Sequence, residues 1–133
     1  VYNYSKAICE KNAASEGVAS RCVFQHGDAK HLDFPDESFD VVISNYVYHN
    51  VMGADMQKLL LESLRVLKKG GVFALNDDMK PKMYGDMEDF AQKLRDMGYQ
   101  DVRLIDTAQE AFGSHRRAAM MMLGSSRLLV GRK

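Results

Sequence analysis

The feature that most constrains the fold is an unbroken apolar run followed by a helical pattern and a second strand pattern. The run Val41-Val42-Ile43 lies within a strand expected at 39–45, and such runs are typical of parallel strands that are covered on both faces. Apolar residues at helical spacing follow over 53–68, and Gly70-Gly71 separates them from a strand expected at 72–76. This order of elements predicts an α/β protein.

The rest of the chain continues the same alternation. We expect further helices at 3–16, with Asn3 as the cap, and at 86–97, helical stretches within 107–123, and short strands at 21–26, 102–105 and 127–130. The run from Ala118 to Leu123, which contains three consecutive methionines, is expected to pack in the core. The pattern favours one α/β domain over residues 1–133 with a mostly parallel sheet.

Composition narrows the function classes. The 18 basic and 18 acidic residues cancel, so the chain lacks the basic footprint of a nucleic-acid-binding protein. No apolar run reaches the ~20 residues of a membrane-spanning helix, and no signal peptide is visible. Cys9 and Cys22 are not spaced as metal ligands, which favours buried thiols in a reducing compartment. We therefore expect a cytoplasmic protein with no metal site and with neither a nucleic-acid nor a membrane partner.

Two segments place polar residues where strands are expected to end, which is where parallel sheets bind cofactors. The first is Gly27-Asp28-Ala29, whose carboxylate either accepts a hydrogen bond from a ligand amino group or is exposed in a turn. The second is the segment 44–50, in which His49 is a candidate general base or, alternatively, a packed or capping residue. Asp77-Asp78, after the next strand, is interpreted as a solvated strand end rather than a metal-binding pair.

Together these segments resemble the middle of class I S-adenosylmethionine-dependent methyltransferases of the type 11 kind. The resemblance rests on Gly27-Asp28-Ala29, on the segment 32–51 and on the block 62–71, where Lys69 replaces a proline that is common in the family. The family's Gly-x-Gly loop occurs nowhere in the chain. The resemblance implies a truncated Rossmann-like sheet, mostly parallel with an antiparallel C-terminal strand, that lacks the family's first two strands.

The resemblance also implies roles for the strand-end residues. Asp28 is expected to accept a hydrogen bond from the adenine amino group of the cofactor, Ala29 to face the ring, and Asn45 to lie near the methionine end. Tyr46 and His49 are the candidate catalytic residues of the acceptor pocket, which Tyr48 would also line. The sulfonium is a strong electrophile, so positioning of donor and acceptor can supply most of the catalysis.

The functional expectation follows from this family pattern. The parent protein is expected to transfer methyl groups from S-adenosylmethionine to a small-molecule acceptor, while this chain alone binds the cofactor weakly or not at all and is inactive. The balanced charge disfavours RNA and protein acceptors. The alternative is a non-catalytic binding or assembly module. Two absent strands would leave an uncovered edge beside 39–45, so we expect either a homodimer or a rearranged strand to cover it.

Overall fold

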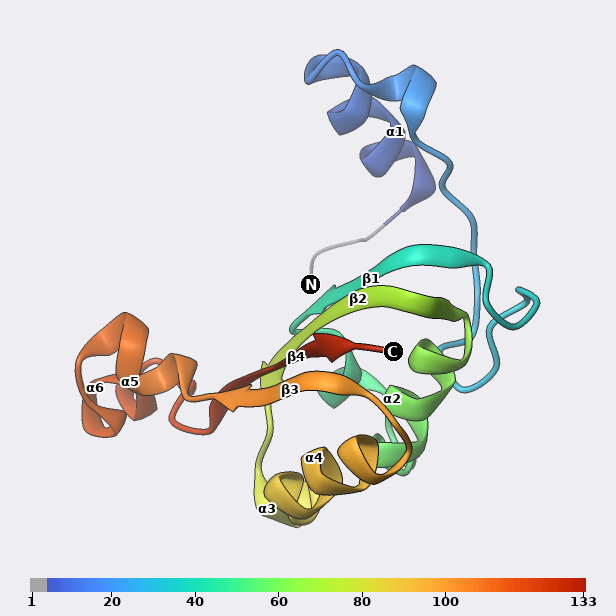
Figure 1. The fold of residues 1–133 in the computed structure, drawn as a ribbon. Coiled ribbons are helices and arrows are strands. Elements are labelled where there is room, and N and C mark those ends of the chain that lie inside the picture. Colours follow the sequence, from blue (N-terminus) through green and yellow to red (C-terminus); the bar gives the residue numbers. More distant parts are fainter. Residues whose placement is uncertain (1–4) are drawn as a thin grey trace.

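The computed structural model describes residues 5–133 and contains a four-stranded sheet (Figure 1). The strands are β1 Phe39–Asn45, β2 Leu67–Asp78, β3 Gln100–Ile105 and β4 Ser126–Arg132. Their order is β1-β2-β4-β3, with β1 parallel to β2 and with β4 antiparallel to both of its neighbours. This arrangement confirms the predicted α/β fold, in which the C-terminal strand runs against the other strands.

The helices leave one face of the sheet uncovered. They are α1 Lys6–Ser15, α2 Met56–Arg65, α3 Pro81–Tyr84, α4 Met87–Asp96, α5 Thr107–Phe112 and α6 His115–Met120, with 3-10 helices η1 Ala19–Arg21 and η2 Tyr48–Asn50. Figure 1 shows α2, α3 and α4 on one face, α1 standing apart beyond β1, and α5 and α6 forming an arm beyond β3. Ser5 caps α1, whereas Asn3, the predicted cap, lies outside the described residues.

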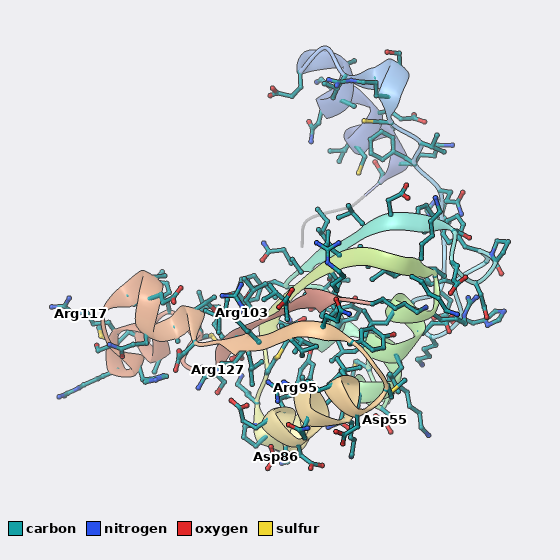
Figure 2. The ribbon with its side chains drawn as sticks, in the orientation of Figure 1. Asp55, Asp86, Arg95, Arg103, Arg117 and Arg127 are labelled. Carbon is teal, nitrogen blue, oxygen red and sulfur yellow. The ribbon has the colours of Figure 1, made fainter. Side chains whose placement is uncertain are left out.

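The two amphipathic helices of the core form where the sequence predicts them. Asp55 caps α2 by accepting from the backbone N–H of Lys58 at 3.2 Å, and Asp86 caps α4 by accepting from that of Asp89 at 3.0 Å (Figure 2). Such caps contribute about 1 kcal/mol each. The apolar faces of both helices are buried against the sheet, through Met56, Leu59, Leu60 and Leu64 of α2 and through Met87, Phe90, Ala91 and Leu94 of α4.

The glycine pair lies inside β2 rather than between a helix and a strand, which corrects the sequence prediction. α2 ends at Arg65 and β2 begins at Leu67, before the glycines. Gly70 has a φ of +78°, and a Cβ on Gly71 would lie 2.6 Å from Leu67 Cδ1 and 2.8 Å from the carbonyl oxygen of Asp40. The pairing of β1 with β2 shifts register in this region. The glycines therefore allow β2 to bulge while it stays close to β1.

The strand predicted at 21–26 does not form. η1 ends at Arg21, residues 22–27 have no regular structure, and the Val23 side chain is 89% exposed. A strand needs a neighbour that satisfies its backbone N–H and C=O groups, and no strand of the described chain lies beside this segment. The segment has also not moved next to β1, so the rearrangement that the sequence allowed is absent from this structure.

β1 is an edge strand with an open apolar face. Val41 and Ile43 are 55% and 76% exposed. Val72 of β2, which is the register partner of Val41, is 37% exposed. The prediction that β1 is covered on both faces is therefore wrong for this chain. The reason is visible in Figure 1, where α2, α3 and α4 all lie on the opposite face. Exposed apolar edges of this kind promote pairing with other strands.

The methionine run is also more exposed than the sequence predicts. Ala118 is fully buried, whereas Met120, Met121 and Met122 are 82%, 65% and 78% exposed. The prediction of core packing fails because α6 belongs to the arm beyond β3, away from the helices that cover the sheet (Figure 1). Residues with helical apolar spacing are buried only when another element packs on them.

Candidate functional site

The carboxyl ends of β1 and β2 lie side by side and bring together the polar residues at each strand end. Asn45 and Asn76 are register partners, and the Asn76 side-chain amide donates a hydrogen bond to Asn45 Oδ1 at 2.8 Å. Beyond Asn45 the chain passes through Tyr46 into η2, and beyond Asn76 it passes through Asp77. This edge of an α/β sheet is the usual position of a ligand site.

The central feature of the site is a hydrogen-bonded pair formed by His49 and Asp77. His49 Nδ1 and Asp77 Oδ1 are 2.5 Å apart. The Asp77 side chain is fully buried, whereas 34% of the His49 side chain is exposed. Because an ionised carboxylate can only accept hydrogen bonds, Nδ1 carries the proton and Nε2 is left as an acceptor. The pair therefore presents a proton acceptor in a fixed orientation at the strand ends.

Asp77 also holds the loop that carries His49. Its Oδ2 atom accepts from the backbone N–H groups of Tyr48 at 2.9 Å and His49 at 3.3 Å, and its Oδ1 atom accepts from that of Asp78 at 2.7 Å. These donors replace the water that a buried carboxylate loses. The interpretation of Asp77-Asp78 as a solvated strand end is wrong, since both residues are buried and Asp78 pairs with Lys80 at 2.7 Å.

Tyr46 turns the chain at the end of β1, and its side chain reaches β4. Its φ of +53° lies in the left-handed region, which is strained for a tyrosine. The hydroxyls of Tyr46 and Ser126 are 2.5 Å apart, and the Ser126 hydroxyl is 2.7 Å from that of Thr107. The ring centres of Tyr46 and His49 are 6.3 Å apart. Tyr46 thus lies beside His49 with its hydroxyl already hydrogen-bonded, an arrangement suited to positioning.

Two buried tyrosines, Tyr48 and Tyr84, lie close enough to Asp77 to be affected by its charge. The Tyr48 hydroxyl is 2.8 Å from that of Ser63, while the Tyr84 hydroxyl has no hydrogen-bond partner among the described residues. Burial raises the pKa of both tyrosines, and the negative charge of Asp77 raises it further. Both hydroxyls therefore stay protonated, which leaves His49 as the base candidate of this group. Tyr48, expected to line the acceptor pocket, is buried in the core.

The candidate cofactor residues Asp28 and Ala29 lie in a turn near the edge of β1. Asp28 is exposed, and its Oδ1 atom accepts from the backbone N–H of Lys30 at 2.9 Å. Ala29 lines an apolar groove of about 670 Å³ that extends along β1 to Asn45. His49 lines a different cleft, of about 430 Å³. The structure therefore places Ala29 and Asn45 in one cavity and His49 in another.

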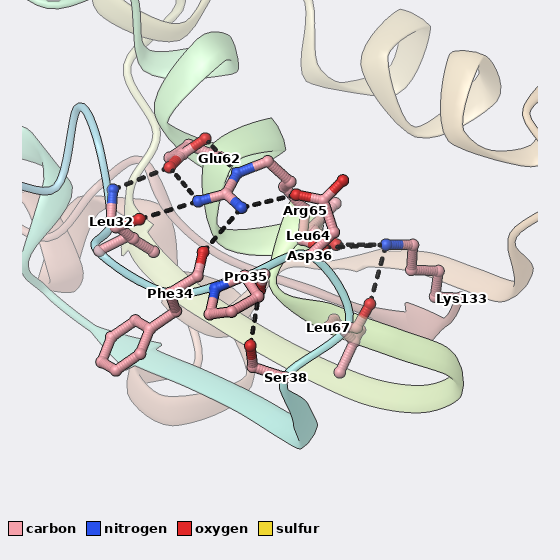
Figure 3. Close-up of polar contacts among 10 residues, drawn as sticks. All are labelled: Leu32, Phe34, Pro35, Asp36, Ser38, Glu62, Leu64, Arg65, Leu67 and Lys133. Carbon is pink, nitrogen blue, oxygen red and sulfur yellow. Dashed lines mark hydrogen bonds and ion pairs between the residues drawn. The ribbon is translucent and has the colours of Figure 1, made fainter.

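A network of charged groups fastens the loop before β1 to α2. The Arg65 guanidinium donates to the carbonyl oxygens of Leu32 and Phe34, both at 2.9 Å (Figure 3). Glu62, one turn earlier, accepts from the Leu32 N–H at 2.8 Å and from Arg65 Nε at 2.9 Å, and Asp36 lies 2.7 Å from Arg65. The first and fourth residues of the block 62–71 thus hold the loop that follows Asp28.

We expect the ionised Glu62 carboxylate to stabilise the folded protein, and this stabilisation to be lost at acidic pH. The Arg65 guanidinium, assisted by the Leu32 N–H, lowers the pKa of Glu62 from 4.5 to about 2. A carboxylate with a lowered pKa stabilises the folded state above its unfolded pKa, so this contribution is lost as the pH falls from 4.5 toward about 2. Urea denaturation of wild-type and Glu62→Gln proteins across this range should show the wild-type advantage shrinking. Parallel pH dependences in the two proteins would contradict this assignment.

Sequence reasoning missed two contributors to the site. The interpretation of Asp77 as solvated overlooks its position at the end of the strand next to β1, which was the available signal that it faces His49. Glu62 and Arg65 belong to the family-like block 62–71, but the sequence does not indicate that they hold the loop before β1. Both contributions come from contacts between residues far apart in the sequence. Asp77 contacts His49, 28 positions away, and Arg65 contacts Leu32, 33 positions away. Helical spacing predicts only the local contact, between Glu62 and Arg65, which lie three residues apart on one helix.

Among residues 5–133, no three His, Cys, Asp or Glu side chains are grouped so that they could hold a metal ion. Within the same part of the chain, every helix is too short or too polar to cross a bilayer.

The sequence matches a known family and several of its members. The model of the family described as methyltransferase domain matches residues 2–75. The chain is 32% identical over 107 residues to the uncharacterized methyltransferase YcgJ of Bacillus subtilis, and 31% identical over 102 residues to 27-O-demethylrifamycin SV methyltransferase of Amycolatopsis mediterranei. These matches cover 79% and 77% of this chain but 42% and 36% of the relatives. The chain therefore spans less than half the length of these curated relatives.

Two solved structures share the fold. The [4+2]-cyclase SpnF aligns with a TM-score of 0.62 and 20% identity, over 96% of this chain and 62% of its own. Phosphoethanolamine N-methyltransferase 2 of Haemonchus contortus, in complex with S-adenosyl-L-methionine, aligns with a TM-score of 0.64 and 16% identity, over 96% and 40%. These low identities show the fold alone. With the family match over more than half of its length, the chain belongs to the methyltransferase domain family, within the class I S-adenosylmethionine-dependent methyltransferases.

Proposed function

We propose that this chain forms the acceptor side of an enzyme that transfers a methyl group from S-adenosylmethionine to a small molecule. The observation that carries the proposal is the His49–Asp77 pair at the adjoining ends of β1 and β2. His49 Nε2 would accept a proton from the acceptor, Asp77 would hold the imidazole in the required tautomer, and Tyr46 would position the loop. His49 and Tyr46 are thus the proposed acceptor-site residues.

The residues present fit only one end of the cofactor. The apolar groove between Ala29 and β1 suits an adenine ring, and the exposed Asp28 carboxylate is an acceptor for its amino group. Asn45 also lines the groove. The described chain offers no glycine-rich turn for the methionine end. When bound, S-adenosylmethionine supplies the electrophilic methyl group. We expect the 133-residue chain by itself to bind it weakly or not at all.

The names of relatives support a small-molecule acceptor. One relative acts on 27-O-demethylrifamycin SV, and demethylmenaquinone methyltransferase of Listeria monocytogenes is 43% identical over 60 residues. The balanced charge of this chain also argues against a nucleic-acid acceptor. The fold alone does not carry the proposal, because a cyclase shares it.

A non-catalytic assembly module is the second candidate function. The observation that favours it is the open edge and face of β1, where Val41 and Ile43 are exposed. This reading predicts self-association without cofactor binding. It would also leave the buried carboxylate of Asp77, and its alignment with His49, without a chemical role.

Labelled methyl transfer tests the enzyme proposal. The longest chain that the gene encodes should transfer the methyl group of S-adenosylmethionine to at least one member of a panel of phenols, hydroxy acids and amines. Isothermal titration on the same protein would show cofactor binding independently of turnover. Cofactor binding without transfer to any acceptor class, or no binding at all, would favour the assembly module.

A further inference from the structure

The cleft beside His49 is lined by several methionine side chains. It has a volume of about 430 Å³ and is lined by His49, Met52, Met56, Lys82 and Met83, together with three small or aliphatic residues of the loop before α2. Met52 and Met83 are 88% and 41% exposed, whereas Met56 is buried. Exposed methionines on facing elements form apolar, polarizable walls that adapt to flat apolar ligands.

Two polar side chains contribute to this cleft. One is His49, whose Nε2 is the acceptor left by the Asp77 pair. The other is the Lys82 ammonium on α3, which forms no ion pair with any residue of the described chain. The neighbouring Lys80 is different, because it pairs with Asp78 at 2.7 Å. The cleft thus combines a proton acceptor, an uncompensated positive charge and thioether walls.

We propose that this cleft binds the methyl acceptor and that the acceptor is an apolar, preferably aromatic, hydroxy acid. Its hydroxyl would donate to His49, its carboxylate would face Lys82, and its ring system would lie between Met52 and Met83. An aromatic ring gains from contact with thioether sulfur, and a carboxylate gains from an ammonium that lacks another partner. The inference rests on the proposed function and adds the chemical class of the substrate.

Binding of two matched probes, measured without cofactor, tests the inference. The 133-residue chain should bind 6-hydroxy-2-naphthoic acid, whose hydroxyl and carboxylate are too far apart to bond to each other, about threefold to fivefold more tightly than 2-naphthol at low salt, since an exposed ion pair contributes modestly. Lys82→Met, which removes the charge and keeps an apolar chain, should abolish the difference. Lys69→Met, at an exposed lysine of β2, should preserve it. His49→Gln should weaken both probes, and circular dichroism would verify that each variant is folded.

Three results would overturn the inference. They are equal affinity for the two probes, equal losses in Lys82→Met and Lys69→Met, and no binding of either probe at millimolar concentration. Lysine-dependent binding by a protein that never transfers a methyl group would uphold the cleft and overturn the proposed function instead. Methyl transfer with the same kcat/KM for both probes would uphold the function and overturn the hydroxy-acid specificity.

Discussion

Methyl transfer should fall by about 10²- to 10⁴-fold when His49 is replaced by glutamine, because a positioned general base contributes on that order. Asp77→Asn should cause a comparable loss. An asparagine amide that donates to His49 Nδ1 would force the ring proton onto Nε2, which leaves no acceptor for the substrate hydroxyl. The measurement is kcat with saturating S-adenosylmethionine for each variant of the longest chain that the gene encodes.

A second histidine of the chain supplies a matched control. His115 Nε2 pairs with Asp106 Oδ2 at 2.9 Å just beyond β3, which is the opposite edge strand of the sheet from β1. His115→Gln therefore removes a similar pair away from the adjoining ends of β1 and β2 and should leave kcat unchanged. Added imidazole should partly restore a His49→Ala enzyme. Asp77→Asn should also lower the free energy of unfolding by about 1–3 kcal/mol, so the folded fraction has to be measured. A His49→Gln enzyme as active as His115→Gln would remove His49 from catalysis.

Self-association through β1 is the second large effect that we expect. An antiparallel pairing of two copies, centred on Val42, places Val41 opposite Ile43 of the second copy on the same face. Asp40 then lies opposite Ser44, so like charges do not meet. The pairing would satisfy the unpaired backbone groups of the β1 edge and cover Ile43, which is 76% exposed. The 133-residue chain should therefore be a dimer at micromolar concentration.

Replacing Ile43 by lysine should separate the dimer. Burying an isoleucine contributes about 1.5–3 kcal/mol, and a two-fold pairing buries two of them, so the dissociation constant should rise at least about 100-fold. Met97→Lys, at the end of α4, changes a residue that is 62% exposed and should not affect assembly. Sedimentation equilibrium is the measurement. A wild-type chain that stays monomeric would contradict this pairing, as would an Ile43→Lys chain that dimerises equally well.

Local patterns predicted the elements whose signals lie within a few residues. The strand 39–45 has the predicted bounds, and α4 begins one residue after Asp86, where the helix is predicted to start. The apolar periodicity and the cap that define them are short-range features. The segment 21–26 had a similar strand signal and formed no strand. The methionines at 120–122 had a helical signal and are exposed. In both cases the outcome depended on whether another element packed alongside.

Local sequence is enough to show which polar residues follow β1, and it places Asn45, Tyr46 and His49 at a strand end. The pairing of Asp77 with His49, in contrast, depends on how the strands assemble. That contact requires the parallel register in which Asn45 lies opposite Asn76, which brings together residues 28 positions apart. The tertiary structure also decided that β1 keeps an open face, because burial depends on the elements that pack on a strand and not on the strand's own residues.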